Sequence, residues 1–185
     1  DQRVFMIGEQ QITANIVIEW CQDAKVCITT FLAWIARHDV DVIIGWNVVQ
    51  FDLWVLQSLC QRYGIDFSLG RGKTPVHWRE SADRDRRYLS IPGRVVLDGI
   101  DVLKMATYRF ESYSLQTVSA ELLGQGKLID SNDLGHKIGQ LFYDDKEALA
   151  RYNLNDCILV WDIFEREKLL DFSLARAQLT GLKMD

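Results

Sequence analysis

The sequence lacks any long apolar run. No stretch approaches the roughly 18 consecutive apolar residues that a transmembrane helix needs, and this excludes a membrane-spanning segment. The opening Asp-Gln-Arg has none of the basic and apolar character of a secretory signal. The chain also does not begin with Met, which fits a fragment of a longer protein or a processed chain.

Cysteine is scarce and shows no metal-binding pattern. The four cysteines form no Cys-x-x-Cys pair and have no zinc-ligand spacing; they are Cys21, Cys27, Cys60 and Cys157. This spacing excludes a zinc ribbon. Most of these residues lie in apolar contexts, which predicts buried free thiols in a reducing cytoplasm.

Positive charge is also in deficit. The chain has 21 Lys and Arg residues against 26 Asp and Glu residues, for a formal net charge of −5. A protein with this balance does not hold duplex DNA by bulk electrostatic attraction. Local contact with nucleic acid is not excluded, because metal ions can neutralise an acidic cluster at one site.

The chain does contain enough apolar residues for one folded domain. Its 185 residues are 48% hydrophobic and 11% aromatic, which predicts a single globular domain over residues 1–185. Strand-like and helix-like segments alternate, which predicts an α/β fold. The expected strands are 4–8, 16–18, 42–45 and 94–98; the expected helices are 23–37, 51–63, 98–106, 115–123 and a final helix from 144 to 164.

Capping residues set the ends of several of these helices. Asp23 and Ser114 are expected N-caps, and Gly64 and Gly124 are expected to close their helices. Asp144 and Glu147 have the spacing of a capping box at the start of the final helix. Residues 124–140 read as a polar surface loop.

Two acidic positions have the setting of a catalytic site. Asp52 follows a buried strand and begins a helix, where free N–H groups and the helix dipole favour a carboxylate. Tyr152 and Asp156 are spaced i and i+4, so they share one face of the final helix. A plain helix cap is the alternative for Asp52, and a Tyr-x-x-x-Asp spacing occurs by chance in many helices.

Together these positions resemble the family B DNA polymerases. The segment Asn47-Val-Val-Gln-Phe51-Asp52 is similar to their second exonuclease motif, an Asn followed after a short gap by Phe/Tyr-Asp. The segment Tyr152-Asn-Leu-Asn-Asp156 is similar to the third, Tyr-x-x-x-Asp. The resemblance is strongest to bacterial members and runs in order from about residue 4 to residue 184.

The resemblance implies a 3′–5′ proofreading exonuclease domain with a ribonuclease H-like fold of the tyrosine (DEDDy) subclass. That fold would be an incomplete mixed sheet flanked by helices. The protein would be located in the bacterial cytoplasm. Asp52 and Asp156 would hold two Mg²⁺ or Mn²⁺ ions, and Tyr152 would position the attacking water. The implied partners are a single-stranded DNA 3′ end and the polymerase domain of the same parent chain.

The same resemblance assigns residues that hold the substrate. Asn47 and Phe51 would contact the frayed 3′ terminus, with Phe51 available for base or sugar packing. Ser114 and Leu115 match a Ser/Thr-Leu-x-x-hydrophobic motif, and Ser114 can also cap its helix. Lys127 lies where the family often has a phosphate-contacting Lys, although Asp130 replaces the apolar residue expected three positions later.

Residues 70–94 differ from the rest of the chain. They carry both prolines and the densest group of arginines: Arg71, Arg79, Arg84, Arg86, Arg87 and Arg94. The family places a β-hairpin insertion here, which makes this segment a candidate contact for the DNA backbone. A solvated loop is the alternative. Asp98, just beyond, is either a metal ligand or the cap of the next helix.

One family motif is absent. The first exonuclease motif, Asp-x-Glu on a central strand, does not occur before Asp52, and the Asp-x-Glu at residues 145–147 lies in a helix start. The chain alone is therefore expected to be weakly active or inactive. Two other functions remain open: a stand-alone ribonuclease H-like exonuclease, and a non-catalytic module that binds single-stranded ends.

The missing motif also affects the sheet. Strand 42–45 is expected to pair with strand 94–98 and to leave one apolar edge open. Either strand 4–8 pairs there, or two chains associate through that edge.

Overall fold

The structure is a computed structural model that describes residues 2–10, 16–83, 86–124 and 134–184, and for residues 134–137 it describes the backbone alone. The chain divides into two compact units. The first unit contains residues 1–27 and 110–163, and the second contains residues 28–109 and 164–185. In the described part of the chain, no helix has the length and apolar character to cross a membrane.

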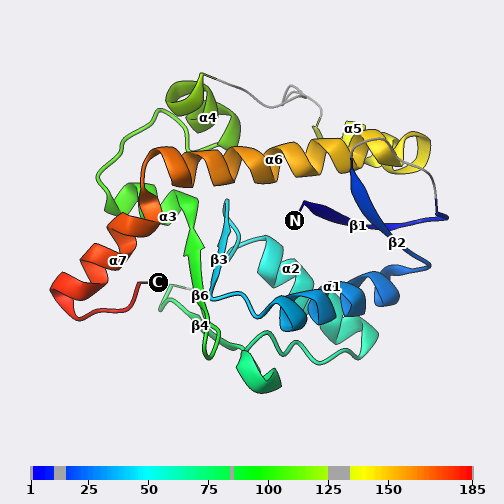
Figure 1. The fold of residues 1–185 in the computed structure, drawn as a ribbon, viewed down its shortest axis with the longest axis horizontal. Coiled ribbons are helices and arrows are strands. Elements are labelled where there is room, and N and C mark those ends of the chain that lie inside the picture. The colour runs from blue at the N-terminus through cyan, green and yellow to red at the C-terminus, as the bar shows by residue number, and fades with distance from the viewer. Residues whose placement is uncertain (1, 11–15, 84–85, 125–133, 185) are drawn as a thin grey trace. The chain divides into compact units, whose positions relative to one another are not determined.

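The second unit is built on a parallel pair of strands. β3 (Val42–Gly45) lies beside β6 (Val95–Asp98), with Val42 opposite Val95 and Gly45 opposite Asp98 (Figure 1). The backbone carbonyl of Asp41 extends the pairing by accepting the Val95 N–H at 2.9 Å. This is the predicted pairing. Both strands end at the same edge, so the segments that follow them begin close together.

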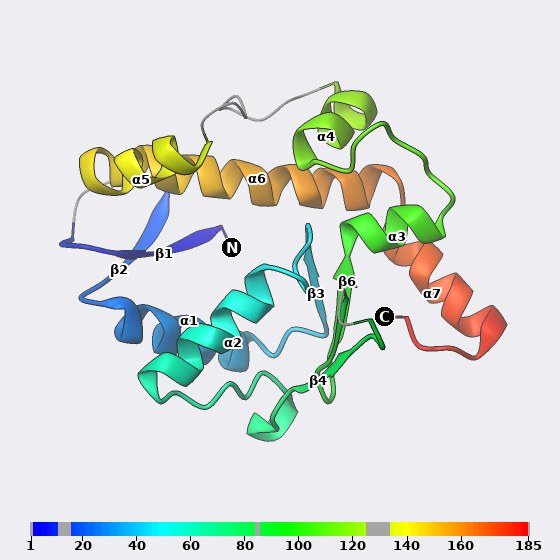
Figure 2. The same ribbon diagram turned by 180° about the vertical axis from the view of Figure 1, so that it is seen from behind.

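Helices precede and follow these strands in the chain, and α1 (Ala24–His38) and α2 (Asp52–Tyr63) contribute to one core. α1 precedes β3, α2 follows it, and α3 (Gly99–Met105) follows β6. The core contains Ile28, Ile35, Val48, Leu53, Cys60, Phe67, Leu69, Leu89, Ile91 and Val96. α7 (Leu169–Thr180) contacts α3, and both views show the two helices side by side (Figures 1 and 2).

The predicted hairpin is present in the second unit. After the 3₁₀ turn η1 (Arg71–Lys73), strands β4 (His77–Glu80) and β5 (Arg87–Ser90) form an antiparallel ladder. Gln50 ties this hairpin to the segment after β3. Its side-chain nitrogen donates to the Arg87 carbonyl at 2.6 Å, and its oxygen accepts the Arg87 N–H at 2.9 Å.

The first unit contains a separate two-stranded sheet. β1 (Arg3–Ile7) pairs in parallel with β2 (Val17–Cys21), and Val4, Met6 and Ala150 are buried around it. The expectation that strand 4–8 pairs with β3 is therefore wrong. The backbone of β1 instead forms its hydrogen bonds with β2, a strand close to it in sequence.

Helices make up the rest of the first unit, and one prediction there is wrong. α4 (Leu115–Leu123) ends at Gly124 as predicted, with Gly124 left-handed at φ 68°. The predicted loop 124–140 overlaps α5 (Leu134–Asp144), where apolar residues 134, 138, 141 and 142 have helical spacing. The two glycines at 135 and 139 obscure that pattern, because glycine disfavours helices.

The start of α6 (Lys146–Arg166) is also displaced by one residue from the prediction. Asp144 ends α5, and Asp145 is the capping residue, since its carboxylate accepts the Ala148 N–H at 2.9 Å. The expected capping box at Asp144 and Glu147 is therefore wrong by one position. The short break between α5 and α6 places the cap there. α7, beyond Phe164, was not predicted.

Candidate functional site

A tight loop joins β3 to α2 and carries the second-motif residues. Gly45 ends the strand where a side chain has no room, because a Cβ there would lie 2.5 Å from the Val48 Cβ. Asn47 then adopts a left-handed backbone with φ 58°. The Phe51 N–H donates to the Asn47 carbonyl at 3.0 Å, and α2 begins at Asp52 as predicted.

Asp98 holds this loop from the neighbouring strand. Its Oδ1 accepts the N–H of Asn47 at 3.2 Å, and its Oδ2 accepts the N–H of Val49 at 3.5 Å. Oδ1 also accepts the Ile100 N–H at 3.1 Å, so Asp98 is the N-cap of α3. Of the two predicted roles the cap is confirmed. The contacts with the loop were not predicted, and no local sequence pattern marks them.

Burial governs the ionisation of Asp98. The residue is 6% exposed, and burial raises the pKa of its carboxyl above 3.8, with a smaller contribution from the charge of Asp101. The three backbone N–H groups oppose this rise in pKa because they stabilise the charged form.

Asp52 lies beside this buried carboxylate. The residue is exposed on its surface, yet partial loss of water raises its pKa above 3.8. Its own backbone N–H opposes that rise, and the negative charge of Asp98 adds to it. A divalent cation next to Asp52 would favour the charged carboxylate, so the local charge balance fits a cation ligand.

The remaining second-motif residues face outward. Phe51 is 60% exposed, which leaves its ring available to a base or sugar. Asn47 is also exposed, and it binds Asp98 through its backbone N–H and not through its side chain. Both positions agree with the predicted substrate contacts, which stay predictions.

The third-motif residues lie on α6 in the first unit. Tyr152 is 6% exposed and Asp156 is half-buried, and their i,i+4 spacing places them on one helix face, as predicted. Asp156 therefore follows the phenol by one helical turn.

The other predicted substrate residues in the first unit differ in exposure. Ser114 is exposed and caps α4, because its hydroxyl accepts the Thr117 N–H at 3.1 Å; the predicted cap is confirmed. Leu115 is buried, so its side chain packs in the interior. Lys127 lies outside the described residues.

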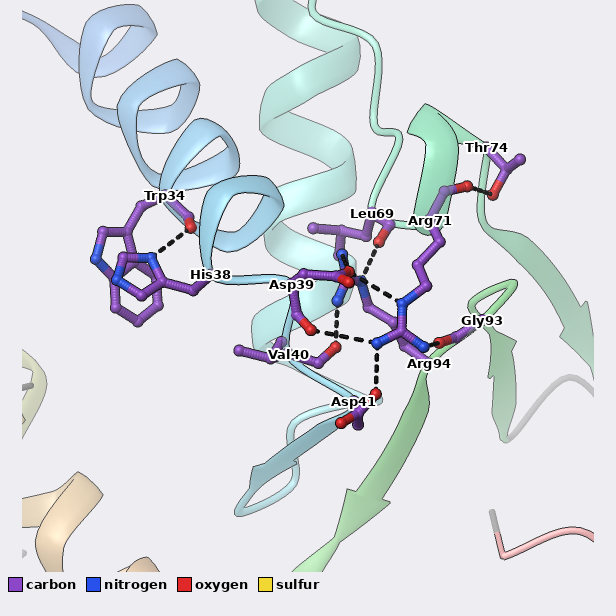
Figure 3. A network of polar contacts seen from close by, with 10 residues as sticks. All are labelled: Trp34, His38, Asp39, Val40, Asp41, Leu69, Arg71, Thr74, Gly93 and Arg94. Atoms are coloured by element: carbon purple, nitrogen blue, oxygen red, sulfur yellow. Dashed lines mark hydrogen bonds and ion pairs between the residues drawn. The ribbon is translucent and has the colours of Figure 1, made fainter.

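Two of the arginines in residues 70–94 form hydrogen bonds and ion pairs at the base of the hairpin. Arg94 is buried, and it donates to the carbonyls of Leu69 and Val40 and pairs with Asp39 at 3.1 Å (Figure 3). Arg71 donates to the Asp39 carboxylate at 3.0 Å and to the Gly93 carbonyl at 2.9 Å, and it also pairs with Asp41. These two side chains are therefore structural.

Other arginines of the insertion lie on the hairpin itself. Arg79 and Arg86 lie over the Tyr88 ring at 4.8 and 5.7 Å, and Arg87 lies over the Trp54 ring at 4.1 Å. Arg84 lies outside the described residues. Arg86 also pairs with Asp101 at 2.5 Å, and Arg87 pairs with Glu80 at 3.9 Å. The contact of Arg79, Arg86 and Arg87 with the DNA backbone stays a prediction.

The available metal ligands are few. Among the residues that the structure describes, no three His, Cys, Asp or Glu side chains come together to hold an ion. Asp52 and Asp156 supply carboxylate oxygens, which suit hard divalent cations. The family that the two motifs resemble is generally dependent on divalent metal. The chemistry of these donors fits such an ion.

Comparison with known proteins agrees with the two motifs. A family model for "DNA polymerase family B, exonuclease domain" matches residues 1–118. The chain is 42% identical to DNA polymerase II of Escherichia coli (strain K12) over 187 residues, which is 98% of this chain and 24% of that protein. It is 31% identical to the DNA polymerase delta catalytic subunit of Mesocricetus auratus over 164 residues, which is 81% of this chain and 14% of that protein.

A third relative is a DNA polymerase of a Thermococcus strain. The DNA polymerase of Thermococcus sp. (strain 9oN-7) is 29% identical over 142 residues, covering 75% of this chain and 17% of that protein. The chain thus spans about a quarter or less of the length of these curated relatives. On the family match and the identity to DNA polymerase II, this chain belongs to the exonuclease domains of the family B DNA polymerases, a 3′–5′ exonuclease enzyme family.

Proposed function

We propose that the chain acts as the 3′–5′ proofreading exonuclease domain of a bacterial polymerase that resembles DNA polymerase II. Its substrate would be the single-stranded 3′ end of DNA, and its product a shortened strand and a nucleotide. The observation that supports this proposal is that a chain of this family carries both motifs, with Asp52 at the start of α2 and with Tyr152 and Asp156 on one face of α6.

The proposed site uses each residue in one role. Asp52 and Asp156 would be carboxylate ligands of two Mg²⁺ or Mn²⁺ ions, which supply an activated water and stabilise the leaving 3′ oxygen when bound. The phenol of Tyr152 orients the attacking water. Phe51 offers its exposed ring to the terminal base or sugar, and Asn47, Ser114, Leu115 and Lys127 complete the proposed contacts with the strand.

The proposal extends to the architecture and surroundings. We propose that both units form one ribonuclease H-like domain of the DEDDy type, encoded beside a polymerase domain in the same parent chain. The hairpin arginines Arg79, Arg86 and Arg87 would contact the DNA backbone. The four free cysteines fit the reducing bacterial cytoplasm.

The test uses the parent-length protein. Asp52→Ala and Asp156→Ala are each expected to slow digestion of a 3′-labelled single-stranded oligonucleotide by about 1000-fold or more, because a metal-held transition state is worth several kcal/mol. Tyr152→Phe should lose a smaller factor, since only the position of the water changes. Asp171→Ala on α7 is the control and should retain full activity.

Two outcomes contradict this division of roles. Equal losses from all three variants, with unchanged circular dichroism, would show that Tyr152 is as indispensable as the aspartates. The chain of 185 residues alone is expected to digest the same oligonucleotide poorly even with Mn²⁺. If it matches the parent-length protein, the active site has been misplaced. Strand binding without cleavage by the parent-length protein would favour the non-catalytic module.

A further inference from the structure

We propose that Asp98 is a positioning residue for the nuclease site, because it fixes the loop of residues 47–52 that presents Asp52. This inference rests on the proposed function and names a residue that neither exonuclease motif contains. Asp98 would not touch substrate. It would act through the backbone of the loop.

The two carboxylate oxygens of Asp98 have different tasks. Oδ1 accepts the Asn47 N–H at 3.2 Å and the Ile100 N–H at 3.1 Å, so it joins the loop to the start of α3. Oδ2 accepts the Val49 N–H at 3.5 Å and serves the loop alone. A cap for α3 needs only one oxygen. The second oxygen therefore has a function beyond capping.

The loop depends on outside support. Asn47 has the left-handed φ of 58°, which is unfavourable for a residue other than glycine. Phe51, at the N-cap position of α2, makes no side-chain capping bond. The amides of Asn47 and Val49 would lose their acceptors without Asp98, and a backbone N–H deprived of its partner is costly.

Close packing transmits the position of Asp98 to the loop. A Cβ on Gly99 would lie 2.8 Å from the ring of Trp46, and a Cβ on Gly45 would lie 2.5 Å from the Val48 Cβ. The loop thus lies directly against residues 98 and 99. Asp98 is also close enough to Asp52 for its charge to raise the pKa of that carboxyl.

The substitution Asp98→Asn separates the two tasks. The asparagine oxygen can still accept from Ile100 and Asn47, and asparagine is as good an N-cap as aspartate. Its NH₂ group would then face the Val49 N–H, donor against donor. A residue that only caps α3 would tolerate this change, whereas a residue that positions the loop would not.

The experiment measures amide hydrogen exchange and Mn²⁺ broadening by NMR on the 185-residue chain. In Asp98→Asn we expect the Val49 amide to exchange about 10-fold faster, while the Ile100 amide keeps its wild-type rate. Broadening of the amide signals around Asp52 should then need about 10-fold more Mn²⁺, as is typical when the partner of a ligand is lost. Asp23→Asn is the matched control. It alters an N-cap that accepts one amide, Val26, at 2.8 Å, and should change neither measurement.

Each result supports or overturns the proposal. Wild-type Val49 exchange in Asp98→Asn overturns it, and so does faster exchange with unchanged Mn²⁺ broadening. Asp52→Asn tests the proposed function separately: if that variant binds Mn²⁺ as the wild type does, Asp52 is no metal ligand. Should Asp98→Asn fail to fold, the wild type still decides, because Asn47 and Val49 amides that exchange at unstructured rates would overturn the proposal.

Discussion

Arg94 and Asp98 are charged residues buried in the second unit, and both form hydrogen bonds with backbone groups. The Arg94 side chain is 3% exposed and donates to carbonyls that follow α1 and precede η1, while Asp98 accepts three N–H groups. A buried charge is tolerated when hydrogen bonds replace water. These two residues stand at the two ends of the segment 94–98 and connect its ends to segments far away in sequence.

Arg94→Met tests the first of these connections. We expect the free energy of unfolding to fall by about 3 kcal/mol, because the carbonyls of Leu69 and Val40 lose a charged donor inside the protein. Urea unfolding followed by tryptophan fluorescence measures the change. Arg79→Met, on the exposed hairpin surface, is the matched control and should alter stability by about 0.5 kcal/mol or less. Equal effects of the two substitutions would contradict the structural role of Arg94.

Asp39 makes stability depend on pH in the acid range. The hydrogen bond from Arg71 is the largest cause that lowers the pKa of Asp39 below 3.8. A lowered carboxyl pKa contributes stability that is fully present above pH 3.8 and is lost as the pH falls through the folded-state pKa. In Arg71→Met the Asp39 pKa should therefore rise toward 3.8, and the stability difference from wild type should shrink in acid.

The measurement for Asp39 is direct. The ¹³Cγ shift of Asp39 is titrated by NMR in the wild type and in Arg71→Met, with urea unfolding at pH 5 and pH 2. Lys73→Met, two residues away, controls for loss of a positive charge in the same turn. An Asp39 pKa that is identical in wild type and Arg71→Met would show that the ion pair does not form in solution.

At the scale of elements, N-cap residues decide where helices begin, and in α6 the cap is one specific member of two adjacent aspartates. The helix that carries Tyr152 and Asp156 starts after Asp145, whose backbone N–H completes α5 by donating to the Leu141 carbonyl at 2.9 Å. Asp145 thus serves both helices, while Asp144 is the last residue of α5. The sequence has an aspartate at both positions, and the position of the break between the helices makes Asp145 the N-cap of α6.

Alanine substitutions distinguish the two acids. Asp145→Ala should lower the free energy of unfolding by about 1 kcal/mol, because the Ala148 N–H loses its acceptor. Asp144→Ala should cost less than half of that. Chemical denaturation followed by circular dichroism at 222 nm measures both. A larger loss from Asp144→Ala would restore the capping box predicted from the sequence.

At the scale of the whole molecule, β3 has an edge that the described strands do not fill. β3 pairs with β6 only, in a sheet of two strands, and its residues are half-buried. A strand edge with unpaired backbone groups recruits another strand. Because β1 pairs with β2, the remaining prediction is that two chains associate through the edge of β3.

Sedimentation velocity over a concentration series tests this association. We expect the average mass of the chain to rise from monomer toward dimer with concentration, and Ile44→Lys in β3 should shift the transition to higher concentration. Leu179→Lys is the comparison, since Leu179 is an exposed leucine on α7, and it should leave the transition unchanged. A monomer at every concentration would contradict the prediction, and an effect of Leu179→Lys alone would place the contact on α7.

Much of this protein follows from its sequence. The α/β class, the hairpin, the pairing of β3 with β6, the caps at Asp23 and Ser114 and the closing glycines Gly64 and Gly124 were all predicted, as was the shared face of Tyr152 and Asp156. The α/β class, the caps, the closing glycines and the shared helix face depend on residues a few positions apart or on the periodicity of apolar residues, so that information is local. The hairpin and the pairing of β3 with β6 were instead expectations from the resemblance to the polymerase family.

The tertiary structure decided the features that join distant residues. Asp98 meets amides 51 and 49 positions earlier in the chain, and Gln50 meets Arg87 37 positions later. The choice of β2 as the partner of β1, and the use of Arg71 and Arg94 at the base of the hairpin, are of the same kind. A carboxylate or guanidinium has the same hydrogen-bonding capacity wherever it stands in a sequence. Its partner is set by which backbone groups the packing brings within hydrogen-bonding distance and removes from water.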